Sequence, residues 1–481
     1  MNNDNNKPNE LIDITHLIVP EKDPSFLTDD AAFDLYETCY FLMEQLILDN
    51  PKMISEPDFE ETFYDIIYEF VVDSCQFDSD IFFNDDAEAE IDEIIDCAKT
   101  DFFKYFMPPR SYSSSIILGP PNYEYITKQL KKLREIPQPE QRTDAWYQFR
   151  HGLITASNAY KAFESDSVKN QLIYEKCQPL SLSIGMDSDI LDDDTKEIVM
   201  VNTNSTLHWG QKYEPLSVKI YESMYETSVE DFGCIRHDKY AFLGASPDGI
   251  NIDIKSPRYG RMLEIKNIVN REIDGIPKKE YWIQMQMQME VWGLNECDFL
   301  ETKFSEYINY DAFKEDTVED LFEDDDGLEF TNVCLSKDEK QKGIIIYFHT
   351  KEGKPHYVYK PLDFIHPDDI QKWEEGILAK FQSPQYGYTF MKYIYWKLDY
   401  MSCVLVPRNR QWFEANIGEL EAIWATIKRE RVSGYEHRAP NKKAKKDINS
   451  SGLDISSFFK SEIGISNKCL LQYVKVNKVD N

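Results

Sequence analysis

Three side chains near the middle of the chain have the types and spacing for metal-assisted chemistry. Asp248 stands in a Ser-Pro-Asp-Gly turn, and Glu264 and Lys266 follow in the alternating segment Met262 to Ile268. Strand residues two apart point to the same side, so Glu264 and Lys266 share a face. A strand pairing across the turn would bring Asp248 beside Glu264. Two converging carboxylates are costly unless a cation holds them together, and an oxygen-rich site of this kind suits Mg²⁺ or Mn²⁺.

An ordinary structural explanation competes with this hypothesis. Pro-Asp-Gly is a common turn sequence, and a Glu-x-Lys pair often belongs to a solvated strand face. The flanking sequence favours a site, because the helix predicted to start near Glu280, in KKEYWIQMQMQMEVWG, carries Gln284, Gln286 and Gln288 among Met, Ile and Trp. Core helices rarely carry amides without polar partners, and Gln284 and Gln288, four apart, lie on one helix face.

The elements that must position these residues follow from periodicity. An apolar strand from Ala241 to Gly244 precedes the turn. The strand from Met262 to Ile268 alternates, so that Leu263 and Ile265 are expected to be buried on the face opposite Glu264. The order is therefore strand, turn, strand and helix.

Four motifs in this order resemble the YqaJ-type viral recombinase nucleases, the phage lambda exonuclease-like group of the PD-(D/E)XK nuclease superfamily. They are RTDAWYQFRHGLITASNAY (Arg142 to Tyr160), LHWGQKYEPLSVKIYE (Leu207 to Glu222), SPDGI with LEIKN, and YWIQMQMQMEVWG. The resemblance covers Arg142 to Tyr307, and the long extensions are similar to those of the giant-virus version. It implies an α/β (α+β) fold, with a restriction-endonuclease-like core whose mixed central sheet is flanked by helices.

The resemblance also implies a site with two Mg²⁺ or Mn²⁺ ions. Asp248 and Glu264 are expected to bind the principal metal together with the backbone carbonyl of Ile265, and Glu214 is expected to complete a second, weaker site. By pattern alone, Glu214 is an exposed residue of the helix that includes Trp209.

Two further residues are expected to act beside the metal. Lys266 would orient the attacking water, and Gln284 aligns with the family's helix residue that steadies this lysine or the water. Whether the lysine also transfers the proton stays open.

The first motif supplies candidates for binding a DNA backbone phosphate. The resemblance assigns this role to Arg150 and Ser157, with Arg142 as a weaker match. From spacing alone, a simpler explanation is that Trp146 and Arg150, four apart on a helix, place an arginine beside an aromatic ring, while Ser157 belongs to a helix N-terminus.

Composition and cysteine usage bound the class of protein. The 481 residues, 42% of them hydrophobic, are enough for two or three globular domains. Nine cysteines without a CxxC pair argue for a reducing compartment and against a zinc ribbon or an iron–sulfur cluster. No apolar run reaches transmembrane length, and the N-terminus lacks a signal-peptide pattern. We therefore expect an intracellular protein that is not secreted, and the resemblance to a viral family implies the cytoplasm or nucleus of a virus-infected host.

A net charge of −33 is unusual for a protein that handles DNA. Residues 1–110 hold 28 acidic and 6 basic residues, a net of −22, so most of the excess lies outside the motifs. The excess charge thus belongs to an appendage rather than to the site. This appendage is solubilising, a docking module for a basic partner, or a gate that repels misplaced DNA.

The chain is expected to divide into six segments. They are an acidic helical domain with a loose N-terminus (1–110), a linker and helix (111–140), the nuclease core with an acidic loop at 187–197 (141–310), an acidic insertion (311–342), a hairpin followed by helices running to about Glu430 (343–430), and a basic, partly disordered tail (431–481). The tail includes NKKAKKD, a nuclear-import signal or phosphate-binding segment, and a sequence similar to a sliding-clamp-binding peptide at Ile455, Phe458 and Phe459.

The expected function is metal-dependent hydrolysis of DNA. The resemblance implies a 5′→3′ exonuclease that acts on duplex ends in recombination, repair or replication, with a single-strand annealing protein as a possible partner and an oligomer as a possible state. The alternatives are a structure-specific endonuclease and a non-catalytic DNA-binding or interaction protein with the same fold. No membrane partner is expected.

Overall fold

The computed structural model describes residues 27–75, 85–141, 143–180, 205–323, 327 and 329–439. The chain separates into two units, 1–438 and 439–481, and each helix and strand given below lies in the first. The expected acidic loop 187–197, the basic run NKKAKKD, the clamp-like residues Ile455, Phe458 and Phe459, and Arg142 all lie outside the described residues. Within the described ranges, no helix combines the length and the apolarity that crossing a bilayer requires.

The N-terminal region is helical, as the sequence predicts. It contains α1 (Asp29–Asp49), a 3₁₀ turn η1 (Met53–Ser55), α2 (Phe59–Cys75) and α3 (Asp85–Tyr105). The side chain of Thr28 caps α1, and acidic residues occupy the first turns of α1 and α2, where they complement the helix dipole. Cys39, Met43 and Ile47 recur every four residues and form the buried stripe of α1.

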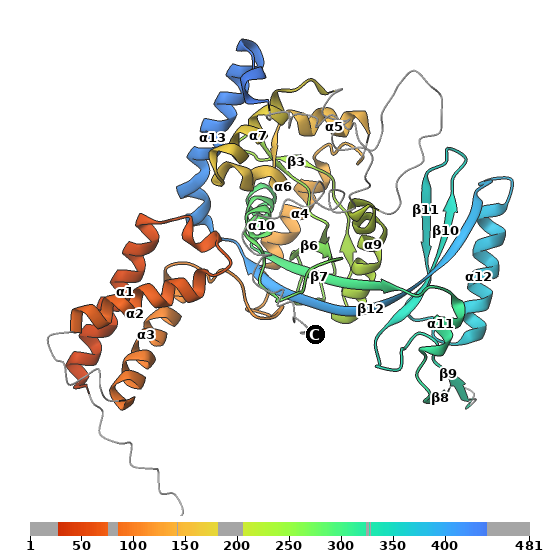
Figure 1. The fold of residues 1–481 in the computed structure, drawn as a ribbon, viewed down its shortest axis with the longest axis horizontal. Coiled ribbons are helices and arrows are strands. Elements are labelled where there is room, and N and C mark those ends of the chain that lie inside the picture. Colours follow the sequence, from red (N-terminus) through yellow and green to blue (C-terminus); the bar gives the residue numbers. More distant parts are fainter. Residues whose placement is uncertain are drawn as a thin grey trace, which may run out of the picture. The chain divides into compact units, whose positions relative to one another are not determined.

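A seven-stranded mixed sheet forms the centre of the unit (Figure 1). Its order is β11 (Pro355–Tyr359), β10 (Lys342–His349), β12 (Thr389–Pro407), β7 (Glu296–Glu306), β6 (Met262–Asn267), β5 (Gly249–Asn251) and β2 (Val229–Glu230). Strands β6 and β7 are parallel and are joined by α10 (Lys279–Trp292), while the other neighbours are antiparallel. The predicted α/β class, with a mixed central sheet and an N-terminal helical region, is confirmed.

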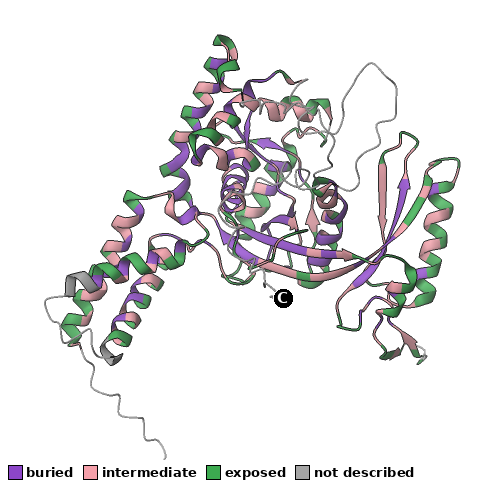
Figure 2. Cartoon of the chain, in the orientation of Figure 1, coloured by how far each residue is buried: buried purple, intermediate pink, exposed green. Residues whose placement is uncertain are grey.

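Helices cover both faces of β6. On one face, Leu263 and Ile265 pack with Tyr221 of α9 (Thr206–Tyr225), as the alternation predicts. On the other face lies α10, whose Trp282 and Met285 belong to the main hydrophobic core. Figure 2 shows the buried residues concentrated in α10 and the middle strands.

A smaller sheet and several short helices surround α10. The sheet contains β1 (Ile154–Thr155), β4 (Leu243–Ala245) and β3 (Ile235–Arg236), with β1 and β4 parallel. The helical segments are α4 (Tyr123–Glu135), α5 (Asp144–His151), α6 (Ala156–Ala159), η3 (Tyr160–Phe163), α7 (Asp166–Cys177), α13 (Arg410–Ser433) and η4 (Glu436–Arg438). The short helix α6 packs directly on α10.

The expectation of continuous helices from the hairpin to about Glu430 is wrong. Between α12 (Pro367–Gln382) and α13, the 19-residue strand β12 pairs with both β7 and β10. Its sequence, TFMKYIYWKLDYMSCVLVP, is rich in aromatic and β-branched residues that favour strands. The expected acidic insertion contains α11 (Tyr310–Glu315) and a small hairpin of β8 (Leu321–Glu323) and β9 (Glu329–Thr331).

A buried ion cluster ties β7 to segments that are distant in the sequence. Asp298 is fully buried and accepts hydrogen bonds from Arg258 (2.7 Å), Arg261 (3.1 Å), Tyr221 (2.7 Å) and Ser115 (2.6 Å). It thereby joins the linker, the β5–β6 connection and α9. Because buried charges are costly without partners, each group in this cluster depends on the others.

Asp298→Ala should destabilise the protein by about 3–5 kcal/mol, because it leaves two buried guanidinium groups without their shared carboxylate. Urea unfolding measures this loss. The matched control is Glu230→Ala, which breaks an exposed pair with Arg134 and should cost at most about 1 kcal/mol. Equal losses in the two variants would show that the cluster does not organise the core.

Candidate active site

The carboxylate of Glu264 is the most enclosed charged group of the predicted site. Glu264 lies in β6 with none of its surface exposed. Its Oε1 accepts hydrogen bonds from the Gln284 side chain (2.6 Å) and from the Lys266 ammonium, and its Oε2 accepts one from Gln288 (2.6 Å). Strand β6 supplies the acid and the lysine on one face, and α10 supplies both amides from above that face.

Asp248 is held against the same strand. It lies between β4 and β5, and its backbone N–H donates to the carbonyl of Leu263 (3.1 Å). Its Oδ2 accepts a hydrogen bond from the backbone N–H of Ile265 (2.7 Å). The turn therefore fixes Asp248 beside Glu264 by backbone contacts on both sides of that residue.

Asp248 and Glu264 lie close enough for their negative charges to repel each other. Burial raises the pKa of Asp248 well above its usual range, and the negative charges of Glu264 and Glu214 raise it further, while Lys266 and the Ile265 N–H act in the opposite direction. Burial alone would lower the pKa of Lys266, but the carboxylates of Glu264 and Asp248 outweigh it and raise that pKa above the ordinary value. Lys266 is consequently a cation at neutral pH.

One side of the site is open to solvent. Asp248, Lys266, Tyr281 and Gln284 are half-buried, in contrast to Glu264 behind them. The ammonium of Lys266 lies 4.9 Å from the centroid of the Tyr281 ring, a cation–π arrangement. A substrate could reach the lysine and Asp248 from this side.

The three glutamines of α10 bind two different parts of the protein. Gln284 and Gln288 face Glu264, and Gln288 also donates to the carbonyl of Ser246 (3.1 Å). Gln286 instead binds the backbone of Pro407 and Asn409, where β12 leads into α13. Sequence reasoning named Gln284 and missed Gln288 and Tyr281 as site residues, although the four-residue spacing of the two amides was the signal for Gln288.

Glu214 lies on α9 and is half-buried. Its charge raises the pKa of Asp248 and also that of Tyr359, which places it near both groups. In the part of the chain that the structure describes, however, no three His, Cys, Asp or Glu side chains gather closely enough to form a metal-binding cluster. The two crowded carboxylates of Asp248 and Glu264 fit a divalent cation, because such an ion relieves the repulsion that raises the pKa of Asp248.

The predicted phosphate-binding residues lie on α5 and α6. The guanidinium of Arg150 stacks over the Trp146 ring at 4.4 Å, as the spacing predicts, and its charge lowers the pKa of buried Cys234 against the effect of burial. Ser157 is exposed, with its Oγ 3.3 Å from that of Thr155. Ser157 belongs to α6, which packs on the helix that carries Gln284, whereas Arg150 is engaged by an aromatic ring.

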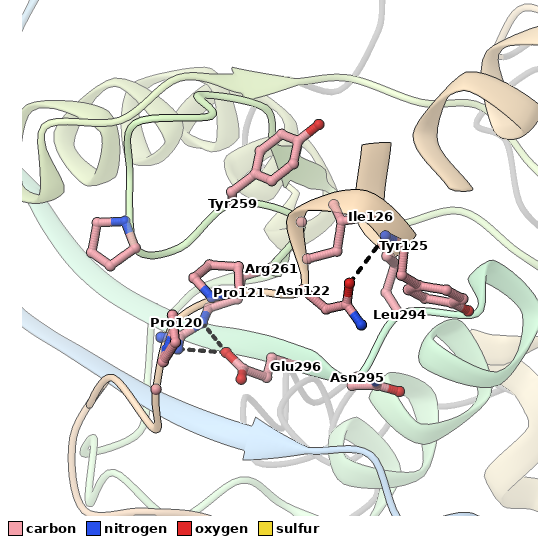
Figure 3. Close-up of a pocket in the computed structure, with 13 residues that line it drawn as sticks. Pro120, Pro121, Asn122, Tyr125, Ile126, Tyr259, Arg261, Leu294, Asn295 and Glu296 are labelled. Atoms are coloured by element: carbon pink, nitrogen blue, oxygen red, sulfur yellow. Dashed lines mark hydrogen bonds and ion pairs between the residues drawn. The ribbon is translucent and has the colours of Figure 1, made fainter. Parts of the chain in front are cut away.

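A separate pocket of about 120 Å³ lies beneath the start of α4 (Figure 3). Its lining includes Pro120, Tyr125, Tyr259 and the ion pair of Arg261 with Glu296. None of its lining residues belongs to the predicted site, so the pocket and the crowded carboxylates are distinct features.

The segment that carries the acids and the lysine is similar to a known domain. Residues 145–295 match the model of the YqaJ-like viral recombinase domain. This match contains the β4-to-α10 segment described above.

A curated relative comes from a giant virus. An uncharacterized protein of Acanthamoeba polyphaga mimivirus is 28% identical over 348 residues, which is 67% of this chain and 57% of that protein. The chain thus spans little more than half the length of that relative.

Solved structures with lower similarity were also found. An alkaline exonuclease (LHK-Exo) from Laribacter hongkongensis aligns with 60% of this chain and 94% of its own, at 17% identity and a TM-score of 0.32. The same exonuclease in complex with dAMP aligns with the same coverage, at 18% identity and a TM-score of 0.31.

Asp248→Asn should stabilise the protein at pH 7.5 in the presence of a chelator. A raised aspartate pKa means that the folded state binds a proton that the unfolded state has released, so stability falls as pH rises above about 4. The amide removes this loss and can still accept the Ile265 N–H. Thermal unfolding at pH 7.5 and below pH 4 measures the effect, which should vanish at the lower pH.

The control for this comparison is Asp238→Asn, which changes an exposed carboxylate paired with Lys132. It should alter the melting temperature little at either pH. A melting temperature for Asp248→Asn below that of the unmodified protein at pH 7.5 would contradict the crowding of acids described here.

Proposed function

We propose that this protein is a Mg²⁺- or Mn²⁺-dependent deoxyribonuclease, and specifically a 5′→3′ exonuclease that acts on duplex ends in viral DNA recombination, repair or replication. The observation that carries the proposal is the convergence of Asp248, Glu264 and Lys266 on one face of β6, inside the segment that matches the YqaJ-like domain. Two acids and a cationic lysine at a solvent-accessible edge suit hydrolysis of a charged phosphodiester.

Asp248 and Glu264 would hold the principal metal ion, with the Ile265 carbonyl as an additional ligand. A bound divalent ion would lower the pKa of a water molecule and offset charge that develops on the phosphate. Glu214 is the proposed residue of a second, weaker site, supported by its electrostatic effect on Asp248. The proposal for two ions is thus supported by charge proximity.

Lys266 and Gln284 would prepare the reacting groups. The Lys266 ammonium stays protonated and lies at the open side of Glu264, so it can orient a water molecule and offset negative charge in the transition state. Gln284 donates to the same oxygen of Glu264 as the lysine does, and it thereby fixes the direction of that carboxylate. Arg150 and Ser157 would bind a backbone phosphate of the DNA.

Each of Asp248→Asn, Glu264→Gln and Lys266→Met should reduce Mg²⁺-dependent degradation of linear duplex DNA by about a thousandfold or more, because each removes a group that acts on the transition state. The assay is release of nucleotides from a uniformly labelled duplex. Lys255→Met, an exposed lysine beyond β5, serves as the control and should keep the original rate.

Metal binding gives a readout independent of cleavage. Mg²⁺ should raise the melting temperature of the unmodified protein but not that of Asp248→Asn or Glu264→Gln, because a ligand stabilises only a state that binds it. If the three site variants keep the rate of the control, or if Mg²⁺ stabilises all variants equally, the assigned roles are incorrect.

The direction of degradation and the requirement for a duplex end can be tested with end-labelled linear duplexes and a closed circular duplex. We expect linear duplex to be degraded with early loss of a 5′ label and late loss of a 3′ label, while covalently closed circular duplex survives. Gel analysis of the two end-labelled duplexes and the circle separates the possibilities. Cleavage of the circle would indicate an endonuclease, and tight DNA binding without cleavage in Mg²⁺ or Mn²⁺ would indicate a non-catalytic protein.

A further inference from the structure

A further acid, fully buried like Glu264, lies on the same face of the sheet as the predicted site. Glu301 in β7 is the register partner of Lys266 in the parallel strand β6. Two residues earlier in β7, Phe299 is the partner of Glu264 and contacts the ring of Tyr281 in α10, with the ring centroids 5.7 Å apart. Alternation along β7 therefore places Glu301 on the α10 side, next to Lys266.

Only one carboxylate oxygen of Glu301 accepts a hydrogen bond within the described residues. It is fully buried, its Oε1 accepts a hydrogen bond from Arg271, and its Oε2 has no hydrogen-bond partner within the described residues. Burial raises the pKa of Glu301, whereas the guanidinium of Arg271 lowers it. Burying the Glu301 carboxylate costs solvation free energy. A buried ion pair such as Glu301 with Arg271 contributes less to folding stability than apolar packing of the same volume would.

Arg271 belongs to the loop between β6 and α10 and reaches from it to the rim of the site. About 23% of its side chain is exposed, and its Nη1 donates to the carbonyl of Glu272 (3.1 Å). The planar guanidinium carries more donors than these two contacts use. The charges of Arg271, Glu301 and Lys266 all shift the pKa of Tyr281, so the four groups lie within short electrostatic range.

The end of this loop is fixed to the rest of the protein. The guanidinium of Arg110 donates to the carbonyls of Pro277 and Ser55, and the Trp282 side chain donates to the Arg110 carbonyl (2.8 Å). Lys279 pairs with Glu56 of the N-terminal region (2.7 Å) and with a second acid near α7. The loop is therefore anchored at the end where α10 begins.

We propose that Arg271, positioned by Glu301, binds a backbone phosphate of the DNA strand next to the bond that is cut. This inference rests on the proposed function, because it assigns a further DNA contact to the same site. An arginine fork matches a phosphate oxygen pair, and a carboxylate behind it fixes its direction. In a chain of net charge −33, a cation held at the rim of the site also supplies local attraction for a polyanion.

The experiment measures binding without cleavage. A fluorescent linear duplex with a 5′-phosphate is titrated with the full chain in a chelator, over a series of salt concentrations. Arg271→Ala should weaken binding about tenfold and reduce the slope of log affinity against log salt by about 0.9, the value for one lost phosphate contact on duplex DNA. Arg271→Lys should recover part of the affinity, because it keeps the charge and loses the fork.

The matched control is Arg134→Ala. Arg134 is also paired with an acid, Glu230, but it is more exposed than Arg271 and lies on α4. It should leave affinity and salt slope unchanged. Melting temperatures of all variants confirm that each remains folded.

The positioning role of Glu301 is tested separately. Glu301→Gln should weaken binding less than Arg271→Ala does, and the double variant should bind no worse than Arg271→Ala alone, because Glu301 acts only through the arginine. In Mg²⁺, Arg271→Ala should raise KM for DNA more than it lowers kcat.

Two results would overturn the inference. One is an unchanged affinity and salt slope for Arg271→Ala, and the other is an additive loss when Glu301→Gln is combined with it. The binding assay is informative even if the protein does not cleave DNA, so a failure of the nuclease proposal is distinguishable from a failure of the Arg271 assignment.

Discussion

The hydrogen bonds to the carboxylate of Glu264 are the constraint on which the rest of the site depends. A fully buried acid is tolerated only when its oxygens have donors, and here Lys266, Gln284 and Gln288 provide them. These donors come from β6 itself and from α10. The distance of α10 from the sheet and the rotation of the helix about its own axis are therefore both restricted. The crossing of α10 over β6 is therefore fixed by polar contacts as well as by apolar packing.

The remaining architecture maintains this crossing. Apolar residues of α10 anchor it in the main core, and Gln286 ties its middle to the β12–α13 junction. On the opposite face of the sheet, Tyr221 of α9 contributes its hydroxyl to the Asp298 ion cluster. Strand β6 is thus held between two helices that each make specific polar contacts, which gives the carboxylates of the site a stable position relative to Lys266.

Local sequence patterns predicted the strand, turn and helix that carry the site. They did not predict which residues of other strands join the site, because that depends on long-range strand pairing. The alternation of Met262 to Ile268 places Glu264 and Lys266 on one face, and the Asp-Gly turn places Asp248 beside them, because both depend on near neighbours in the sequence. Glu301 lies beside Lys266 on the same face of the sheet because of the parallel register of β6 and β7. No local sequence pattern specifies this register.

Strand β12 illustrates the same limit at the level of the fold. Its mixture of aromatic, apolar and lysine residues has no clean period of two, because different parts of it are covered by different partners. The roles assigned to Glu214, Arg150 and Ser157 came from a family resemblance. In the structure Glu214 lies near Asp248, Arg150 lies against the Trp146 ring and Ser157 is exposed, while Arg142 lies outside the described residues.

Arg110 makes the acidic helices part of the site's support. Its guanidinium is almost entirely buried between Ser55, which follows α1, and Pro277, which precedes α10. Removal of residues 27–75 would remove the Ser55 carbonyl that Arg110 binds and the Glu56 carboxylate that pairs with Lys279, so the start of α10 would lose contacts that lie outside residues 145–295. A change at Ser55 or Glu56 would therefore be felt first at the start of α10, the helix that carries Gln284 and Gln288.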